Sequence, residues 1–163
     1  MLRTLCVSLV VEAVVSYRSI PRILNLFNKF TSFYIEQIPH FTSVINWNLR
    51  LGVGLLKQVD EVQRSWIAIV DHSINIGIKK VLVVLRVDVD ILLKKQKAIT
   101  LSDCDCIGIK VSQKINGETI AKELHDIFDI SGKPVGVIAD GDYTLNKGIK
   151  NYIEFQSKDY RDN

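Results

Sequence analysis

Two short apolar runs, each closed by an aspartate, constrain the fold of this 163-residue sequence more than any other feature. Residues 66–71 read Trp-Ile-Ala-Ile-Val-Asp, and residues 135–140 read Val-Gly-Val-Ile-Ala-Asp. An uninterrupted apolar run of this length is typical of a strand that is buried on both faces, because a half-exposed strand alternates apolar and polar residues. The chain therefore needs a sheet, in which Asp71 and Asp140 each end a strand.

The segment between these runs predicts two more strands and a helix. Residues 81–87 and 104–111 read as strands, so three strands follow one another and pair as an antiparallel meander. Residues 118–128 predict an amphipathic helix, and a strand reached through a helix usually lies parallel to a neighbour. Asp142 or Thr144 caps a last helix. The expected fold class is α+β, with α/β-like features: a mixed sheet with helices packed on it.

The front of the chain predicts three helices instead. Residues 2–15 are apolar at helical spacing, Ser19 followed by Pro21 favours a second helix start, and Thr42 or Ser43 can cap a third. Three short helices with basic residues outside are compatible with a helix-turn-helix module, and equally with any small three-helix bundle.

The net charge of +3 lies wholly in this front part. Residues 1–60 carry six Lys or Arg and three acidic residues, whereas residues 61–163 carry fifteen of each sign. This asymmetry predicts an anionic partner for the front part. The cations that we expect to contact phosphate groups are Arg18, Arg22, Arg50 and Lys57.

Neither a membrane nor an oxidising compartment is expected. No segment reaches the roughly 18 uninterrupted apolar residues of a membrane span. Three cysteines are an odd number and too few for a disulfide scaffold, which favours a reducing interior. The predicted location is the cytoplasm.

The two aspartates suggest a metal site if their strands are adjacent and parallel. Neighbouring strands lie about 4.8 Å apart, and two carboxylates at that spacing repel unless a cation lies between them. Such oxygen ligands suit Mg²⁺ or Mn²⁺, and the chemistry that uses them is two-metal phosphoryl transfer. The alternative is that Asp71 and Asp140 only cap the turn or helix that follows.

The sequence as a whole resembles the DDE-type transposases, which have an RNase H-like catalytic domain. The resemblance covers nearly the whole chain and depends on the order and spacing of its parts. The segments that carry it are 16–18 and 43–52 for the helical DNA-binding region, 66–73 with 77–85 for the first hairpin, and 132–141 with 145–149 for the fourth strand and its helix.

The resemblance implies an activity and a set of roles. Asp71 would be the first catalytic carboxylate and Asp140 the second, with Mg²⁺ or Mn²⁺ as cofactor. Residues 1–60 would be a helix-turn-helix-like DNA-binding region and residues 61–163 an RNase H-like core. The reaction would be cleavage and strand transfer of transposon ends, with double-stranded DNA as partner. A homo-oligomer is left open, as is association with the nucleoid in a bacterial host.

The sequence departs from the family pattern in the third catalytic acid, which the activity requires. The family uses a third acid, usually a Glu on a later helix, and Glu154 would lie about 15 Å along the last helix, too far to bridge metals about 4 Å apart. We therefore expect a core that is incomplete at its C-terminal end and inactive alone. The alternatives are a non-catalytic DNA-binding remnant, or an RNase H-like nuclease that uses Asp71, Asp140 and Asp142. For His72, a structural hydrogen bond is favoured over a contact with metal or DNA.

Overall fold

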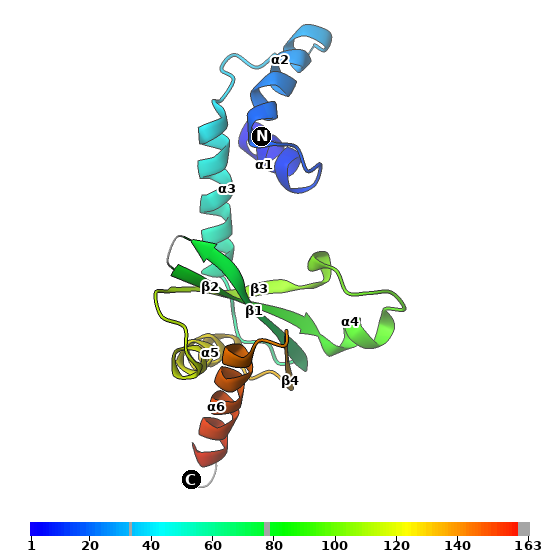
Figure 1. The fold of residues 1–163 in the computed structure, drawn as a ribbon. Coiled ribbons are helices and arrows are strands. Elements are labelled where there is room, and N and C mark those ends of the chain that lie inside the picture. The colour runs from blue at the N-terminus through cyan, green and yellow to red at the C-terminus, as the bar shows by residue number, and fades with distance from the viewer. Residues whose placement is uncertain (33, 77–78, 160–163) are drawn as a thin grey trace. The chain divides into compact units, whose positions relative to one another are not determined.

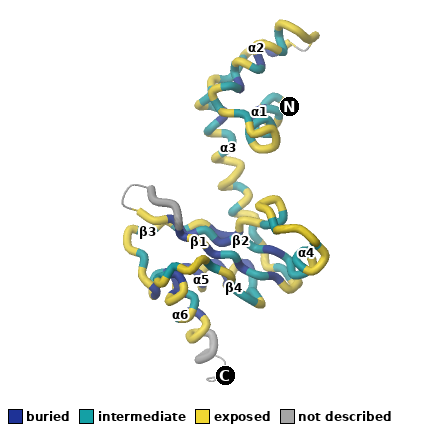
Figure 2. Tube along the Cα trace, turned by 45° about the vertical axis from the view of Figure 1, so that its right-hand side comes forward, coloured by how far each residue is buried: buried dark blue, intermediate teal, exposed yellow. Residues whose placement is uncertain are grey.

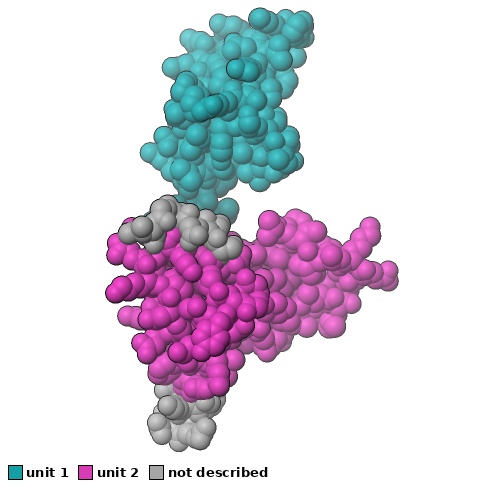
Figure 3. All heavy atoms as spheres, in the orientation of Figure 1, with its two compact units in different colours: residues 1–57 teal, residues 58–163 magenta. Residues whose placement is uncertain are grey.

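The structure is a computed structural model that describes residues 1–32, 34–76 and 79–159. The chain divides into two compact units, called unit 1 (residues 1–57) and unit 2 (residues 58–163), which are coloured separately in Figure 3. Each unit has a hydrophobic core of its own, so each is described by itself.

Unit 1 is helical, as expected. Its elements are α1 (Leu2–Val11), the short 3₁₀ helix η1 (Tyr17–Ser19), α2 (Ile20–Phe30) and α3 (Phe41–Leu56). Pro21 lies in the first turn of α2, where its missing N–H costs nothing. The first helix ends earlier than predicted, and Val14 beyond it has a positive φ of 53°, which a helix cannot continue.

The start of α3 and the connection before it differ from the prediction. The cap is His40, whose Nδ1 accepts the Thr42 N–H at 3.5 Å, and not Thr42 or Ser43. Residues 31–40 join α2 to α3, whereas a helix-turn-helix uses a turn of three or four residues. This connection is tied to α2, because the Asn28 side chain donates to the Ile35 carbonyl at 2.9 Å and accepts the Ile35 N–H at 2.8 Å.

Unit 2 is a four-stranded mixed sheet with helices, which confirms the α+β class. Its elements are β1 (Trp66–Ile76), β2 (Lys79–Asp88), α4 (Val89–Lys94), the 3₁₀ helix η2 (Leu101–Asp103), β3 (Asp105–Ser112), α5 (Gly117–Ser131), β4 (Gly136–Ala139) and α6 (Tyr143–Asp159). The strand order is β3-β2-β1-β4 (Figure 1). The first three strands pair antiparallel and β4 pairs parallel to β1, as the helix before β4 predicts.

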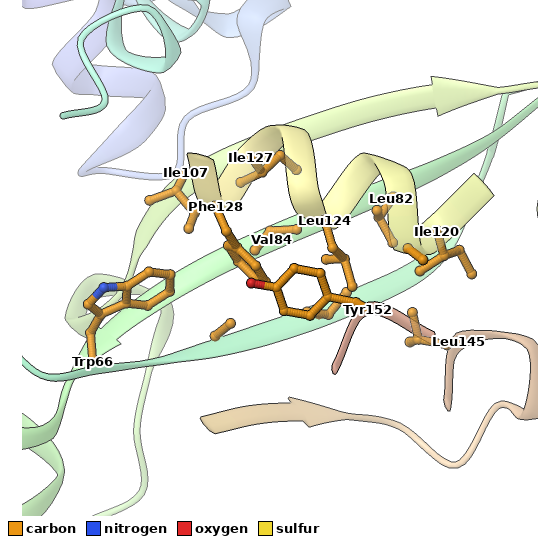
Figure 4. Packing of buried hydrophobic residues seen from close by; sticks show 13 residues of the cluster. Trp66, Leu82, Val84, Ile107, Ile120, Leu124, Ile127, Phe128, Leu145 and Tyr152 are labelled. Atoms are coloured by element: carbon orange, nitrogen blue, oxygen red, sulfur yellow. The ribbon is translucent and has the colours of Figure 1, made fainter. Parts of the chain in front are cut away.

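The core of unit 2 lies between one face of the sheet and the helices α5 and α6. Alternate strand residues, among them Ala68 on β1 and Leu82 on β2, are buried under these helices. Figure 4 shows Phe128 of α5 between Trp66 and Tyr152, with ring centroids 5.8 and 5.2 Å away in edge-on geometry.

The other face of the sheet is more open than the apolar runs predicted. Ile138 on β4 is 52% exposed and Ile109 on β3 is 46% exposed, while Ile67 and Ile69 on β1 are half-buried (Figure 2). The prediction of a strand buried on both faces is therefore wrong for β4 and only half met on β1, whereas Val81 and Val87 of β2 are buried on this face too. Both packing helices, α5 and α6, lie on the opposite face.

Candidate functional site

The register between β1 and β4 brings the two predicted aspartates together. The parallel pairs run from Ile67 opposite Gly136 to Val70 opposite Ala139. Asp71 and Asp140 are the next residue on each side, so they follow the last parallel pair of two neighbouring strands, which lie about 4.8 Å apart. Both residues are exposed. This juxtaposition is the geometry that a shared cation would need.

Strand β1 does not end at Asp71, contrary to the prediction. It continues to Ile76, and its pairing with β2 passes from Asp71 opposite Val83 to Ile74 opposite Val81. One extra β1 residue in this step makes a β-bulge, a feature that re-aims side chains and is common beside active sites. Asp71 therefore lies next to a bulge within the strand. The residues Asn75-Ile76-Gly77 would by themselves favour a turn, but Asn75 and Ile76 belong to β1, and Gly77 lies outside the described residues.

His72 points to the face of the sheet opposite to Asp71. Alternate residues of β1 are buried, and His72 continues that series with only 8% of its surface exposed, whereas Asp71 is exposed. The Nε2 atom of His72 lies 2.9 Å from Oδ1 of Asp142. The structure thus gives His72 the hydrogen bond that we favoured, although the residue lies in a strand and not in a turn.

Asp142 caps α6, one of the two caps that we predicted. Its Oδ1 accepts the Leu145 N–H at 2.9 Å as well as the contact from His72. The Leu145 N–H, followed by the His72 ring, lowers the pKa of the Asp142 carboxyl below its ordinary value. The N–H of Asp142 itself donates to Oδ1 of Asp140 at 3.2 Å. A role for Asp142 as a third metal ligand would compete with these two contacts at Oδ1.

The donor set that fits a cation therefore consists of two carboxylates. Asp71 and Asp140 offer oxygen atoms of the kind that Mg²⁺ and Mn²⁺ prefer. Within residues 1–32, 34–76 and 79–159, no group of three or more His, Cys, Asp or Glu side chains is arranged to hold a metal ion. Glu154 is 3.9 Å from Lys150 on the exposed surface of α6. A cation at Asp71 and Asp140 would need further oxygen ligands from water or phosphate.

The four predicted DNA-binding cations are exposed: three lie on η1, α2 and α3, and Lys57 is the residue that follows α3. Arg18 on η1 and Arg22 on α2 are four residues apart, and the Arg18 guanidinium lies 5.7 Å from the Phe41 ring centroid. Arg50 and Lys57 are seven residues apart at the end of α3, a spacing that puts them on nearly the same side of a helix. Their spacing along the chain thus groups the four cations in two pairs.

A fifth cation, Arg3, was missed by the sequence analysis. It lines a groove of about 450 Å³ between α1 and α3, together with Arg50 and Trp47. The Arg3 guanidinium lies 5.4 Å from the Trp47 ring centroid, within the range of a cation–π contact. Arg3 and Arg50 are far apart in sequence, so only the packing of α1 on α3 brings them together.

The sequence was compared with protein-family models and with curated proteins. No protein-family model matches the chain, and no curated protein matches it either. Among the described residues, no helix is both long enough and apolar enough to cross a membrane.

Proposed function

We propose that this chain is a DDE-type transposase or a fragment of one, in which Asp71 and Asp140 hold Mg²⁺ or Mn²⁺. The observation that carries the proposal is the pairing of β1 with β4. Two parallel neighbours, each followed in register by an aspartate, lie within the order β3-β2-β1-β4. This arrangement supports an RNase H-like core, because the first hairpin and the fourth strand with its following helix are the parts that the sequence resemblance names, and β4 pairs with β1 of that hairpin.

The two aspartates would act as oxygen donors to the cation. When bound, the cation would activate the attacking oxygen and stabilise the leaving oxygen of a DNA phosphodiester. Because Asp71 and Asp140 leave most ligand positions open, DNA phosphates and water would complete the set, and DNA should strengthen metal binding. A second ion would be held loosely by two carboxylates, so we expect weak or absent strand transfer by this chain alone.

Unit 1 would hold the DNA through charge. Arg18, Arg22, Arg50 and Lys57 are exposed, and cations on helix surfaces contact phosphates without selecting a base. Arg3 and Arg50 line the groove between α1 and α3 together with one acid, Glu12, so the charged residues of this groove have a net charge of +1. The partner we propose is therefore double-stranded DNA.

Cleavage of supercoiled DNA with Mn²⁺ tests the catalytic part of this proposal. We expect slow nicking by the unaltered chain and its loss in Asp71→Asn and in Asp140→Asn. The matched control is Asp90→Asn, which alters an exposed acid on α4 in the same unit. If both Asp71→Asn and Asp140→Asn still nick DNA, the two aspartates are not catalytic, and the alternative that they only cap the following turn or helix is favoured. DNA binding without nicking in any variant would favour the non-catalytic DNA-binding remnant.

Metal binding can be tested without DNA. Calorimetric titration with Mn²⁺ should show one weak site in the unaltered chain. The same site should disappear in Asp71→Asn and in Asp140→Asn but persist in Asp90→Asn. Titration curves that do not differ among the four proteins would contradict the metal assignment.

A further inference from the structure

We propose that His72 and Asp142 are positioning residues, which together hold the Asp140 carboxylate beside Asp71. His72 directly follows Asp71 on β1, and Asp142 lies two residues after Asp140. Their hydrogen bond of 2.9 Å therefore joins the two chain segments just beyond the last paired residues of β1 and β4. The link to a cation rests on the proposed function, whereas the link to the Asp140 side chain does not.

The segment that carries Asp140 needs such a link. Strand β4 has only four residues and its pairing with β1 ends at Ala139, so Asp140 lies at the very end of the paired segment. Gly141 follows, and a Cβ added there would meet nothing within 4 Å. At Gly141 the chain has no packing on the side where a Cβ would lie, so contacts at the two ends of this connection matter for its position.

His72 supplies a rigid anchor. Its side chain is only 8% exposed and continues the buried face of β1, so few orientations are open to the ring. A polar group that is buried to this extent needs a partner, and Asp142 provides it.

Asp142 transmits that anchor to Asp140 through its backbone. The N–H of Asp142 donates to Oδ1 of Asp140 at 3.2 Å. The position of the backbone at residue 142 therefore sets the direction of one Asp140 oxygen. Residues that orient a metal ligand in this way typically change metal affinity by 10–100-fold when they are replaced.

Helix capping alone does not require a carboxylate at this position. Serine caps a helix about as well as aspartate, and Leu145 would keep its acceptor. The shorter serine side chain would lose its reach toward His72, so Asp142→Ser separates the two roles. In contrast, Asp142→Asn keeps both a cap and a side chain of the same length.

The test compares four variants with the unaltered chain. His72→Leu and Asp142→Ser remove the link, Asp142→Asn retains its shape, and Asn116→Ala removes an unrelated cap, since Oδ1 of Asn116 accepts the Thr119 N–H at 2.8 Å on α5. The first measurement is hydrogen exchange of the amide of residue 142, by NMR without metal. The second is Mn²⁺ affinity by calorimetry, with Asp71→Asn as reference.

We expect exchange at residue 142 to accelerate about 10-fold in His72→Leu and Asp142→Ser, which is the loss of one hydrogen bond. Mn²⁺ affinity should fall by about 10-fold or more in the same two variants. Asp142→Asn should restore most of both properties, and Asn116→Ala should change neither.

Two results would overturn the inference: unchanged exchange at residue 142 in both link variants, or an equal loss of Mn²⁺ affinity in Asn116→Ala. A third result separates the two proposals. If exchange accelerates as expected but Asp71→Asn removes no Mn²⁺ site, the positioning of Asp140 stands and the proposed function fails.

Discussion

Units 1 and 2 would serve one function through different kinds of structure. In unit 2, Asp71 and Asp140 obtain their relative position from the register of two hydrogen-bonded strands. In unit 1, the cations Arg18, Arg22, Arg50 and Lys57 lie on helix surfaces. Catalytic groups lose activity when displaced by about 1 Å, whereas attraction between charges changes slowly with distance.

The hydrophobic cores of the two units also differ, in the number of buried residues that form them. Thirteen buried residues form the core of unit 2, on the sheet and under α5 and α6. Five buried residues form the core of unit 1, namely Cys6, Ile20, Leu24, Ile35 and Val44. The larger core lies under the sheet whose register places the carboxylates, so precise geometry and extensive burial occur in the same unit.

The largest expected effect comes from the core of unit 2. Leu124→Ala removes a fully buried side chain of α5 and should lower the free energy of unfolding of unit 2 by about 2–5 kcal/mol. Leu24→Ala in unit 1 should cost no more, because a core of five residues can collapse onto the cavity more readily.

Both effects can be measured in one sample. The chain has two tryptophans, Trp47 in unit 1 and Trp66 in unit 2, so ¹⁹F NMR of protein labelled with 5-fluorotryptophan follows each unit separately during urea unfolding. Leu93→Ala is the control, since this α4 side chain is 80% exposed. If Leu24→Ala lowers the free energy of unfolding of its unit more than Leu124→Ala does, the proposed difference between the two cores is wrong.

A second prediction contrasts one helical glycine from each unit. A Cβ at Gly148 in α6 would lie 2.5 Å from the Ile120 side chain on α5, so Gly148→Ala should destabilise unit 2 by about 1–3 kcal/mol. A Cβ at Gly52 in α3 would meet nothing within 4 Å, so Gly52→Ala should stabilise unit 1 by about 0.5–1 kcal/mol. Urea midpoints measure both, and effects of the same sign would contradict the packing described for α5 and α6.

The third prediction concerns the charges of unit 1. If Arg18, Arg22, Arg50 and Lys57 each neutralise a phosphate, log K for duplex DNA should fall with log salt at a slope of about −3 to −4. Replacing any one of them by Gln should reduce the slope by about 0.9, as should Arg3→Gln if the groove between α1 and α3 faces the DNA. Fluorescence anisotropy at several salt concentrations measures the slope, with the unit 2 variant Lys97→Gln as control. If none of the unit 1 substitutions changes the slope of log K against log salt, unit 1 does not bind DNA through these cations.

The smallest expected effect concerns the ion pair between Lys95 and Asp103 in unit 2. Hydrogen bonds from the Lys95 ammonium, then from Thr100, lower the pKa of Asp103 to about 2. Because the folded-state pKa is the lower one, the stability contributed by this contact is complete above about pH 4 and is lost as the pH falls toward 2. Lys95→Met should move the pKa of Asp103 back toward 3.8. Titration of the Asp103 carboxyl by ¹³C NMR measures the shift, and a value near 3.8 in the unaltered chain would disprove the contact.

Much of unit 2 could be predicted from local sequence patterns. The strand expected at 81–87 and the helix expected at 118–128 lie within β2 and α5, and the strand expected at 104–111 differs from β3 by one residue at each end. Periodicity and turn residues act over short distances along the chain, so they are readable without a fold. Helix α4 was missed because it is only six residues long and follows β2 directly, within a charged connection.

What the sequence by itself determined is the kind and order of the main elements other than α4, a choice of Asp142 or Thr144 as the cap of the last helix, and the excess of positive charge in unit 1. Only the tertiary structure decided that β1 continues past Asp71, that one face of the sheet stays partly open, and that His72 meets Asp142, 70 residues away along the chain. The physical reason is that register, bulges and buried hydrogen bonds depend on which distant segments lie side by side. Local propensity carries no information on that choice, and the position of Asp140 beside Asp71 depends on it.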